Sequence, residues 1–310
     1  MPRALLLVLI LSLLGCGEQT DTLRIGANRW LGYGPLYLAD DLHWMAPSGY
    51  RLVEYPHATG VLRGYRNGLL DAALLTLDEA LSLKSSGLPV QILLITDVSA
   101  GADVLFAKPQ ITQLEQLRGQ RIGVENSALG AFFLSRILDL AKLQPGEVSV
   151  LDMPVNEHLH ALREGRIDAA INFASATASL MPLGVHPLLD SRALPNEIID
   201  VLVINPMRVS SEQARHLREL WFTSQEQWFA QRQASDPRLS RRLGLSNDEL
   251  TQTLAGLQIG DRPLNQQLLD NGTLQHSLEQ LHDYLLSRRL LNKPADTQGM
   301  LPSICEGRGC

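Results

Sequence analysis

The stretch from Leu23 to Trp44, LRIGANRWLGYGPLYLADDLHW, has the pattern of a buried strand, then a polar and aromatic turn, then a helix. A second stretch of the same kind, QRIGVENSALGAFFLSRILDL, runs from Gln120 to Leu140. Both contain the triplet Arg-Ile-Gly, and the two glycines, Gly26 and Gly123, are 97 positions apart. A repeated strand, turn and helix predicts two α/β lobes of similar construction in tandem.

Another pair of segments repeats at the same distance. The segment YRNGLLDAALLT is followed, 97 positions later, by LREGRIDAAINF. Gly68 and Asp71 in the first correspond to Gly165 and Asp168 in the second, and two alanines follow each aspartate. We interpret each glycine as the end of a helix and each aspartate as the start of a strand. These four residues are therefore expected to be architectural.

Apolar runs of strand length alternate with helical patterns along both lobes. This order predicts the α/β class, with mixed sheets that carry helices on both faces. The run IIDVLVI, residues 198–204, is a further buried strand and marks the return of the chain to the first lobe, and the pattern from Ser211 onward is helical. The predicted division is lobe 1 for residues 23–103 and 205–290, lobe 2 for residues 104–204, and a C-terminal tail for residues 291–310.

Two lobes joined by two crossings of the chain form a hinge with a cleft between them. In open α/β sheets, ligands bind beyond the carboxyl ends of the strands. The turn after the first strand of each lobe opens a helix whose free amide groups point to that side. The sequence therefore predicts a binding site in the cleft.

The first 15 residues have the pattern of an export signal. Arg3 precedes an apolar run that is shorter than the about 20 residues needed to span a bilayer. The sequence Leu13-Leu14-Gly15-Cys16 resembles the bacterial lipobox, which implies cleavage before the cysteine and its acylation; the alternative is a buried free cysteine. We expect a lipid on Cys16, a tether over residues 16–22, and a location on the periplasmic side of the cell envelope. The glycine after the cysteine, in place of aspartate, favours the outer membrane.

Charge and cysteine usage exclude several functions. The chain has a net charge of −6, which becomes −7 without the signal and its Arg3, and no basic patch points to nucleic acid. Cys305 and Cys310 can close a small disulfide loop in an oxidising compartment, and the alternative is two free thiols. The sequence has no H-E-x-x-H pair and no G-x-S-x-G setting around Ser127. We therefore expect no enzyme, no metal and no other cofactor.

Six blocks in order carry a resemblance to a known family. They are RIGANRWLGYGPLYLA, GLLDAALLTLDEAL, DVSAGADVLFAKP, LRGQRIGVENSALG, GRIDAAINF and LLDSRALPNEIIDVLVI. Over residues 23–290 the chain resembles the periplasmic solute-binding proteins of ABC importers in the nitrate, sulfonate, taurine and thiamine-precursor branch, the NMT1/THI5-like and SsuA-like proteins. The resemblance implies a type II periplasmic-binding-protein fold, which is a two-lobed Venus flytrap with two hinge crossings.

The resemblance also implies a function. An anchored monomer would capture a small polar solute between its lobes and deliver it to an ABC permease. One alternative is a ligand-sensing lipoprotein that presents its closed form to a membrane signalling protein, such as a sensor kinase or a cyclic-dinucleotide enzyme. Another is a structural envelope lipoprotein that has lost its ligand. One departure bears on specificity, because relatives often have Phe-Glu-Pro where this chain has Phe173-Ala174-Ser175.

Positions that match the family's pocket give ten candidate ligand-binding residues. Trp30 and Tyr33 are expected to stack on the ligand, Asp78 and Asp97 favour a cationic group, and the helix start at Ser127 favours an anionic one, so a zwitterion fits. Single residues also have structural alternatives: Trp30 as a hydrophobic staple, Ser127 as an N-cap, Asp78 as a helix cap and Asn172 as a turn residue. The candidates are Trp30, Tyr33, His57, Thr59, Thr76, Asp78, Asp97, Asn126, Ser127 and Asn172.

Overall fold

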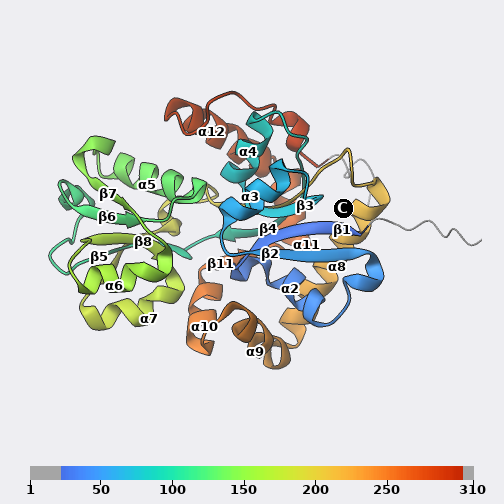
Figure 1. Cartoon of the computed structure of the whole chain (residues 1–310), viewed down its shortest axis with the longest axis horizontal. Helices are drawn as coiled ribbons and strands as arrows, with labels where there is room; N and C mark the ends of the chain where they lie inside the picture. Colours follow the sequence, from blue (N-terminus) through green and yellow to red (C-terminus); the bar gives the residue numbers. More distant parts are fainter. Residues whose placement is uncertain (1–21, 303–310) are drawn as a thin grey trace, which may run out of the picture.

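The computed structural model describes residues 22–302. Its strands form two separate sheets with helices packed around each, and Figure 1 shows the two groups side by side. The predicted two-lobed α/β architecture is confirmed. The predicted export signal, the lipid on Cys16 and the pairing of Cys305 with Cys310 lie outside the described residues. Within residues 22–302, no helix combines the length and apolar character that crossing a membrane requires.

The larger sheet has six strands in the order β11-β4-β10-β3-β1-β2, and we call this sheet with its helices lobe 1. β1 is parallel to both β2 and β3, whereas β10 is antiparallel to both β3 and β4, so the sheet is mixed as predicted. The strands are β1 (Leu23–Asn28), β2 (Tyr50–Tyr55), β3 (Ala72–Thr76), β4 (Gln91–Ser99), β10 (Ile199–Ile204) and β11 (Leu257–Ile259).

The smaller sheet has five strands in the order β7-β6-β8-β5-β9 and forms lobe 2 with its helices. β6 is parallel to β7 and β8, and β5 is antiparallel to β8 and β9, which makes this sheet mixed as well. The strands are β5 (Asp103–Ala107), β6 (Arg121–Val124), β7 (Ser149–Asp152), β8 (Ala169–Phe173) and β9 (His186–Asp190).

The repeated sequence corresponds to repeated geometry. Gly26 of β1 pairs with Ala73 of β3, and Gly123 of β6 pairs with Ala170 of β8 in the same parallel register. A Cβ on either glycine would lie within 3 Å of an apolar side chain of the loop before the paired strand, Leu70 in one lobe and Ile167 in the other. Both glycines are therefore needed for close packing against that loop.

The two Gly-Asp pairs have the architectural role that the sequence predicts. Asp71 accepts hydrogen bonds from the backbone N–H and the guanidinium of Arg24, and Asp168 accepts the equivalent bonds from Arg121. Hydrogen bonds from Arg121 hold the pKa of Asp168 well below its usual range. The preceding glycines both have positive φ, 68° and 69°, at the ends of their helices.

Helices cover both faces of the lobe 1 sheet. One apolar core lies against α2, α8, α9 and α10, and a second lies against α3, α4 and α12 and continues into lobe 2. The lobe 1 helices are α2 (Gly34–Asp41), α3 (Ala58–Arg66), α4 (Leu77–Ser85), α8 (Ser211–Ala230), α9 (Arg232–Leu243), α10 (Asn247–Ala255), α11 (Arg262–Asp270) and α12 (Thr273–Ser287).

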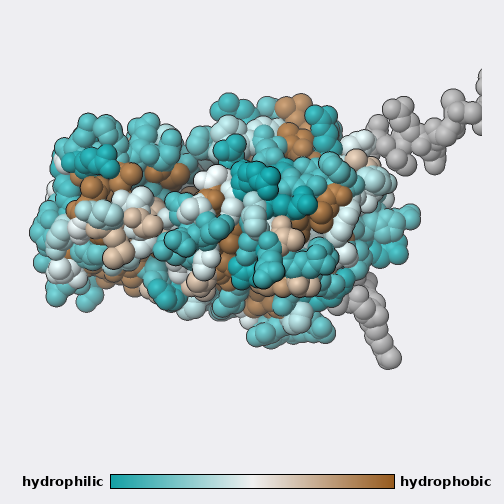
Figure 2. All heavy atoms as spheres, turned by 90° about the horizontal axis from the view of Figure 1, so that it is seen from below, coloured by the Kyte–Doolittle hydropathy of each residue, from teal (hydrophilic) through white to brown (hydrophobic). Residues whose placement is uncertain are grey.

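Lobe 2 has shorter helices, and 3-10 turns punctuate both lobes. The lobe 2 helices are α5 (Ala128–Leu140), α6 (His158–Arg163) and α7 (Thr177–Leu180). The 3-10 turns are η1 (Leu31–Tyr33), η2 (Ala46–Ser48), η3 (Leu114–Leu117), η4 (Pro145–Glu147), η5 (Val155–Glu157), η6 (Ala174–Ala176), η7 (Met181–Leu183), η8 (Ser191–Ala193) and η9 (Gln298–Met300). In the view of Figure 2, most of the visible surface is hydrophilic, and apolar areas are separated by hydrophilic ones.

The chain crosses between the sheets twice, from β4 to β5 and from β9 to β10. The two crossings are bonded to each other, because the hydroxyl of Ser191 lies 2.8 Å from that of Ser99 and accepts the N–H of Gly101 at 2.6 Å. Gly256 packs against the first crossing, where a Cβ would lie 2.6 Å from the backbone nitrogen of Ala102. The hinge is thus a compact unit that consists of two crossings bonded to each other and one close backbone contact.

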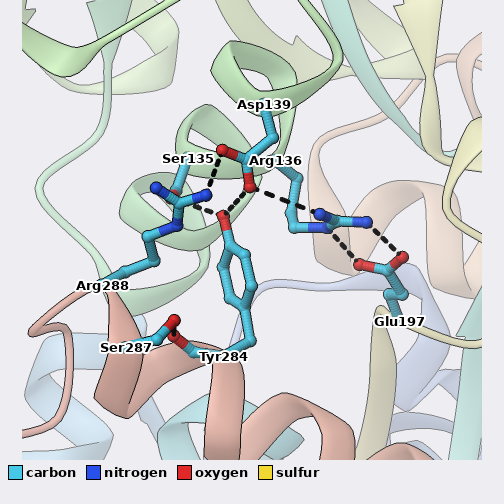
Figure 3. Close-up of polar contacts among 7 residues, drawn as sticks. All are labelled: Ser135, Arg136, Asp139, Glu197, Tyr284, Ser287 and Arg288. Carbon is cyan, nitrogen blue, oxygen red and sulfur yellow. Dashed lines mark hydrogen bonds and ion pairs between the residues drawn. The ribbon is translucent and has the colours of Figure 1, made fainter. Parts of the chain in front are cut away.

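A polar network joins the lobes on the side of α5 and α12 (Figure 3). The Tyr284 hydroxyl of α12 donates to Asp139 of α5 at 2.9 Å, and Arg288 also bonds this carboxylate. Arg136 of α5 makes a bidentate pair with Glu197, which follows β9, at 2.6 and 2.8 Å. This network therefore ties lobe 2 both to α12 and to the second crossing.

Candidate functional site

A small cavity of about 50 Å³ lies between the lobes. Its lining comes from both lobes, from the ends of β1, β3 and β8, the starts of α3, α4, β5 and α5, and the strand β10. This is the side where the carboxyl ends of the parallel strands meet, as the sequence predicts. The lining residues are Asn28, Trp30, Tyr33, Ala58, Thr76, Glu79, Asp103, Glu125, Ser127, Leu129, Phe173 and Asp200.

Larger hollows exist on the outer surface of lobe 1, with volumes of about 550 and 650 Å³. Charged residues that pair with one another line them, such as Arg24 with Asp71 in the first and Arg242 with Asp41 in the second. These side chains form ion pairs with opposite charges on the same surface. The small cavity between the lobes differs because acidic residues line it and no lysine or arginine does.

Two contacts close the cavity from lobe to lobe. The ring of Trp30, in the turn after β1, lies 5.0 Å from the ring of Phe173, at the end of β8. Nδ1 of His57, before α3, lies 3.2 Å from a carboxylate oxygen of Glu125, after β6. An aromatic contact and a polar contact thus join the two rims of the cavity.

The turn after β1 packs on two buried acids, Asp97 and Asp200. The indole N–H of Trp30 donates a long hydrogen bond of 3.4 Å to Asp97 of β4. The fully buried Tyr33 donates from its hydroxyl to Asp200 of β10 at 2.6 Å. Gly32 lies between them, and a Cβ there would overlap the carboxylate of Asp97. The turn therefore needs glycine at this position.

Three polar residues form a row across adjacent strands at the base of the cavity. Asp200 of β10 is in register with Asp97 of β4 on one side and with Thr76 of β3 on the other. Residues in register on antiparallel strands place their side chains on the same face, at Cβ separations of roughly 4.5–5.5 Å. Two carboxyl groups therefore lie next to each other under the turn.

Three more buried carboxyl groups surround this row. Asp78 and Glu79 are the second and third residues of α4, and Asp103 begins β5. Glu79 accepts the backbone N–H of Thr76 at 3.1 Å, and Asp103 accepts the hydroxyl of Ser99 at 2.7 Å. Each of the five carboxyl groups belongs to a residue that is at most 4% exposed. In the described part of the chain, no ion pair joins any of them to a lysine or arginine.

Burial without a cation shifts the ionisation of this group of acids. Removal from water raises the pKa of Glu79 and of Asp97 to about 8, and the charge of Asp78 adds to the effect on Glu79. Burial also raises the pKa of Asp103 to about 6, and it raises that of Asp200 well above its ordinary value, with a contribution from Asp97. Glu79, Asp97 and Asp200 therefore tend to hold their protons at neutral pH.

Four of the predicted residues line the cavity: Trp30, Tyr33, Thr76 and Ser127. Ser127 also accepts the backbone N–H of Gly130 at 3.0 Å, so it is the N-cap of α5 as well. Asp97 and Asp78 lie buried beside the lining, and His57 lies at its rim through its contact with Glu125.

Three predicted residues are placed elsewhere. Thr59 is exposed on α3. Asn126 is exposed and bonds Asp152 at 3.1 Å, away from the cavity, although its neighbour Ser127 faces it. Asn172 donates to the Val155 carbonyl on the far side of β8, because alternate side chains of a strand point to opposite faces. The residue of β8 that faces the cavity is the next one, Phe173.

The sequence prediction missed several lining residues. Glu79 is hidden in the pattern of a capping box, Asp103 and Asp200 are single acids within apolar strands, and Phe173 ends another. The signal that could have located Asp103 and Asp200 is an acid inside a strand that is otherwise apolar. A single charged side chain is rarely buried unless it is paired or has a function.

Comparison with known proteins identifies the family. Residues 32–193 match the model of the family described as NMT1/THI5 like. The chain belongs to the NMT1/THI5-like family. No individually curated protein matches this NMT1/THI5-like chain.

Solved structures share the fold of this NMT1/THI5-like protein. The alkanesulfonate-binding protein SsuA from Xanthomonas axonopodis pv. citri, bound to MOPS, has a TM-score of 0.77 and 16% identity, covering 92% of this chain and 99% of that one. SsuA from Escherichia coli has a TM-score of 0.74 and 18% identity, covering 89% and 95%. The desulfurization enzyme DszB has a TM-score of 0.67 and 17% identity, covering 92% and 97%. The same fold thus occurs in binding proteins and in an enzyme.

Among the residues that the structure describes, no three His, Cys, Asp or Glu side chains are grouped so that they could hold a metal ion. The lining of the cavity also contains no cysteine, histidine or lysine that could act as a nucleophile. The site contains a set of carboxyl groups, three hydroxyl-bearing residues and three aromatic rings, with Tyr33 counted in both of the last two groups.

Proposed function

We propose that this protein is an extracytoplasmic solute-binding protein that encloses a small polar solute between its lobes and delivers it to an ABC importer. The observation that carries the proposal is the cavity itself, which both lobes line at the carboxyl ends of their parallel strands. SsuA, described in solved structures as a sulfonate-binding protein, has the same fold and supports this choice over catalysis.

The proposal includes motion of the lobes. Ligand pockets have volumes of roughly 300–1,000 Å³, whereas this cavity has about 50 Å³. A solute larger than a few atoms therefore enters only when the Trp30–Phe173 and His57–Glu125 contacts separate. The hinge of two bonded crossings gives the lobes an axis for this separation.

The proposal also includes the predicted topology of the chain. A signal over residues 1–15 and a lipid on Cys16 would anchor the protein to a membrane, with the outer membrane favoured, and residues 16–22 would act as a tether. The protein would work as a monomer, with lobe 2 lying in the sequence between the two crossings of the chain and lobe 1 on either side of them. Neighbouring genes test the partner: a permease and ATPase pair supports transport, whereas a sensor kinase or cyclic-dinucleotide enzyme supports a sensing lipoprotein.

The test is calorimetric titration of the protein starting at Gly17 with nitrate, alkyl sulfonates, taurine, amino acids and polyamines. We expect one class to bind at one site per chain. Phe173→Ala should weaken that binding at least tenfold, because Phe173 lines the cavity and contacts Trp30. Phe229→Ala is the matched control, since Phe229 is 41% exposed on α8, outside the cavity. Equal effects of the two substitutions would contradict the proposed site.

A further inference from the structure

The charged residues that line the cavity all carry the same sign. Glu79, Asp103, Asp200 and Glu125 are among the lining residues, and no lysine or arginine is. Asp97 and Asp78 add two more carboxyl groups directly behind the lining. A ligand that enters this cavity therefore meets carboxyl groups and no basic side chain.

The acidic row lowers the stability of the folded protein. Like charges directly opposite on adjacent strands are destabilising, and Asp97 and Asp200 occupy such a pair in the interior of the sheet. Burying an uncompensated carboxylate is strongly unfavourable, and the group takes up a proton instead. A sequence selected only for stability would place apolar residues here, as it does in the remaining positions of β10.

Two buried oxygen atoms at the cavity have no partner. Oδ1 of Asn28 belongs to a residue that lines the cavity and makes no hydrogen bond within the described residues. Oδ2 of Asp78, directly behind the lining, is also buried without a partner there. Oδ1 of Asn28 and an ionised Oδ2 of Asp78 can only accept a hydrogen bond, and buried acceptors require a donor.

The shape of the acidic group distinguishes a molecular cation from a metal ion. The acids do not converge as metal ligands would, since no three of them are grouped for one ion in the described chain. They are distributed over β4, β5, β10 and α4 instead. The aromatic rings of Trp30, Tyr33 and Phe173 complete the lining, and aromatic faces attract organic cations.

The opposite rim does not favour an anion. Ser127 caps the amino end of α5 and already occupies the N–H of Gly130. The carboxylate of Glu125 lies in the same turn and also lines the cavity. An anionic group placed there would approach this carboxylate directly. The zwitterion suggested by the sequence is therefore less well matched than a cation.

We propose that the cavity takes a small organic cation whose N–H groups bind the carboxyl row and whose body lies between the aromatic rings, that is, an amine, amidine or guanidine. The proposal rests on the solute-binding function and names its ligand class. Binding would convert the protonated acids to carboxylates, so that protons leave as the cation enters. The titratable groups that face the site are Tyr33 (η1), His57 (before α3), Asp78 and Glu79 (α4), Asp97 (β4), Asp103 (β5), Glu125 (after β6) and Asp200 (β10).

The experiment is calorimetric titration of the protein starting at Gly17 with ethylamine, putrescine, agmatine and methylguanidine, and with ethanesulfonate and taurine as the matched anion and zwitterion. Each titration is made at pH 6 and pH 8.5, in two buffers that differ in ionisation enthalpy. We expect at least one cation to bind, to release protons, and to bind at least tenfold more tightly at pH 8.5. Ethanesulfonate should not bind.

Two substitutions separate binding from folding. Asp200→Asn keeps an acceptor for the Tyr33 hydroxyl and removes the charge, so we expect a protein that melts no lower than wild type and binds the cation at least tenfold more weakly. Asp270→Asn, an exposed position at the end of α11, should leave binding unchanged.

The outcomes distinguish this inference from the proposed function. Binding of ethanesulfonate or taurine with no cation binding would overturn the ligand class and leave solute binding in place. Cation binding that is equal in Asp200→Asn and wild type would also overturn it, because the acidic row would then not be the site. If the folded protein binds none of the six compounds, the ligand class fails, and the broader titration series decides whether solute binding fails with it.

Discussion

At the scale of single residues, the site is decided by side chains that are far apart in the sequence. Asp97 and Asp200 become neighbours only through the pairing of β4 with β10. No local sequence pattern indicates this contact. The sequence identifies Asp97 as a candidate from its place at the end of a predicted strand, but it does not show that Asp200 is its neighbour. Trp30 and Tyr33 were predictable because they lie in the turn that defines the cleft.

Neighbouring residues in one turn or strand also point their side chains in different directions. Ser127 faces the cavity, whereas Asn126 bonds Asp152. Phe173 faces the cavity, whereas Asn172 points to the opposite face of β8. A sequence shows which segment reaches the cleft, but an error of one position reverses the direction of a side chain.

The pH dependence of stability tests the state of the buried acids. The pKa of Asp97 is about 8 in the folded protein, far above its ordinary value of about 3.8, so between these pH values the unfolded chain loses a proton that the folded chain keeps. The free energy of unfolding should therefore fall as pH rises from about 4 to about 8. Asp97→Asn lacks this group and should be more stable than wild type by on the order of 2 kcal/mol at pH 8, and by little at pH 4.

Urea denaturation of both proteins at pH 4.5, 6 and 8 measures this difference. Asp270→Asn serves as the control, because its carboxylate is exposed. A difference between Asp97→Asn and wild type that stays constant across the three pH values would show that burial does not perturb this carboxyl group.

At the scale of elements, the construction of each lobe follows from short local signals. Both repeats of Arg-Ile-Gly form a strand, both Gly-Asp pairs end a helix and begin a strand, and the register of β1 with β3 equals that of β6 with β8. These features depend on residues close in sequence or on a constant spacing, which is why the sequence predicts them. The return of β10 into the centre of the first sheet is visible only as a buried apolar run.

The hinge offers a test at this scale. A methyl group on Gly256 would approach backbone atoms of Gly101 and Ala102 to within 3 Å, and backbone cannot move aside as a flexible side chain can. Gly256→Ala should therefore lower the free energy of unfolding by about 1–3 kcal/mol. Gly146→Ala is the control, since no atom lies within 4 Å of its added Cβ.

Urea denaturation measures both variants. Equal stability of Gly256→Ala and Gly146→Ala would mean that the first crossing is looser than the structure shows, and that the hinge is not a compact unit.

At the scale of the whole molecule, the lobes share an apolar core, α10 of lobe 1 packs against η6 of lobe 2, and two sets of polar and aromatic contacts join the lobes as well. The contacts at the cavity, Trp30 with Phe173 and His57 with Glu125, are a single ring pair and a single polar pair. The network of Arg136, Tyr284 and Glu197 on the other side has several hydrogen bonds. The polar and aromatic contacts are therefore fewer at the cavity, and we expect the lobes to separate there.

The central claim is that a small solute binds between the lobes, and a melting-temperature screen of the protein starting at Gly17 tests it most directly. A ligand that binds only the folded state adds about 2.7 kcal/mol at one hundred times its dissociation constant, which corresponds to a shift of several degrees. The account predicts such a shift for at least one cationic solute, and its loss in Trp30→Ala. Folded protein, free of carried-over ligand, that shows no shift with any cation, anion or zwitterion would contradict the claim.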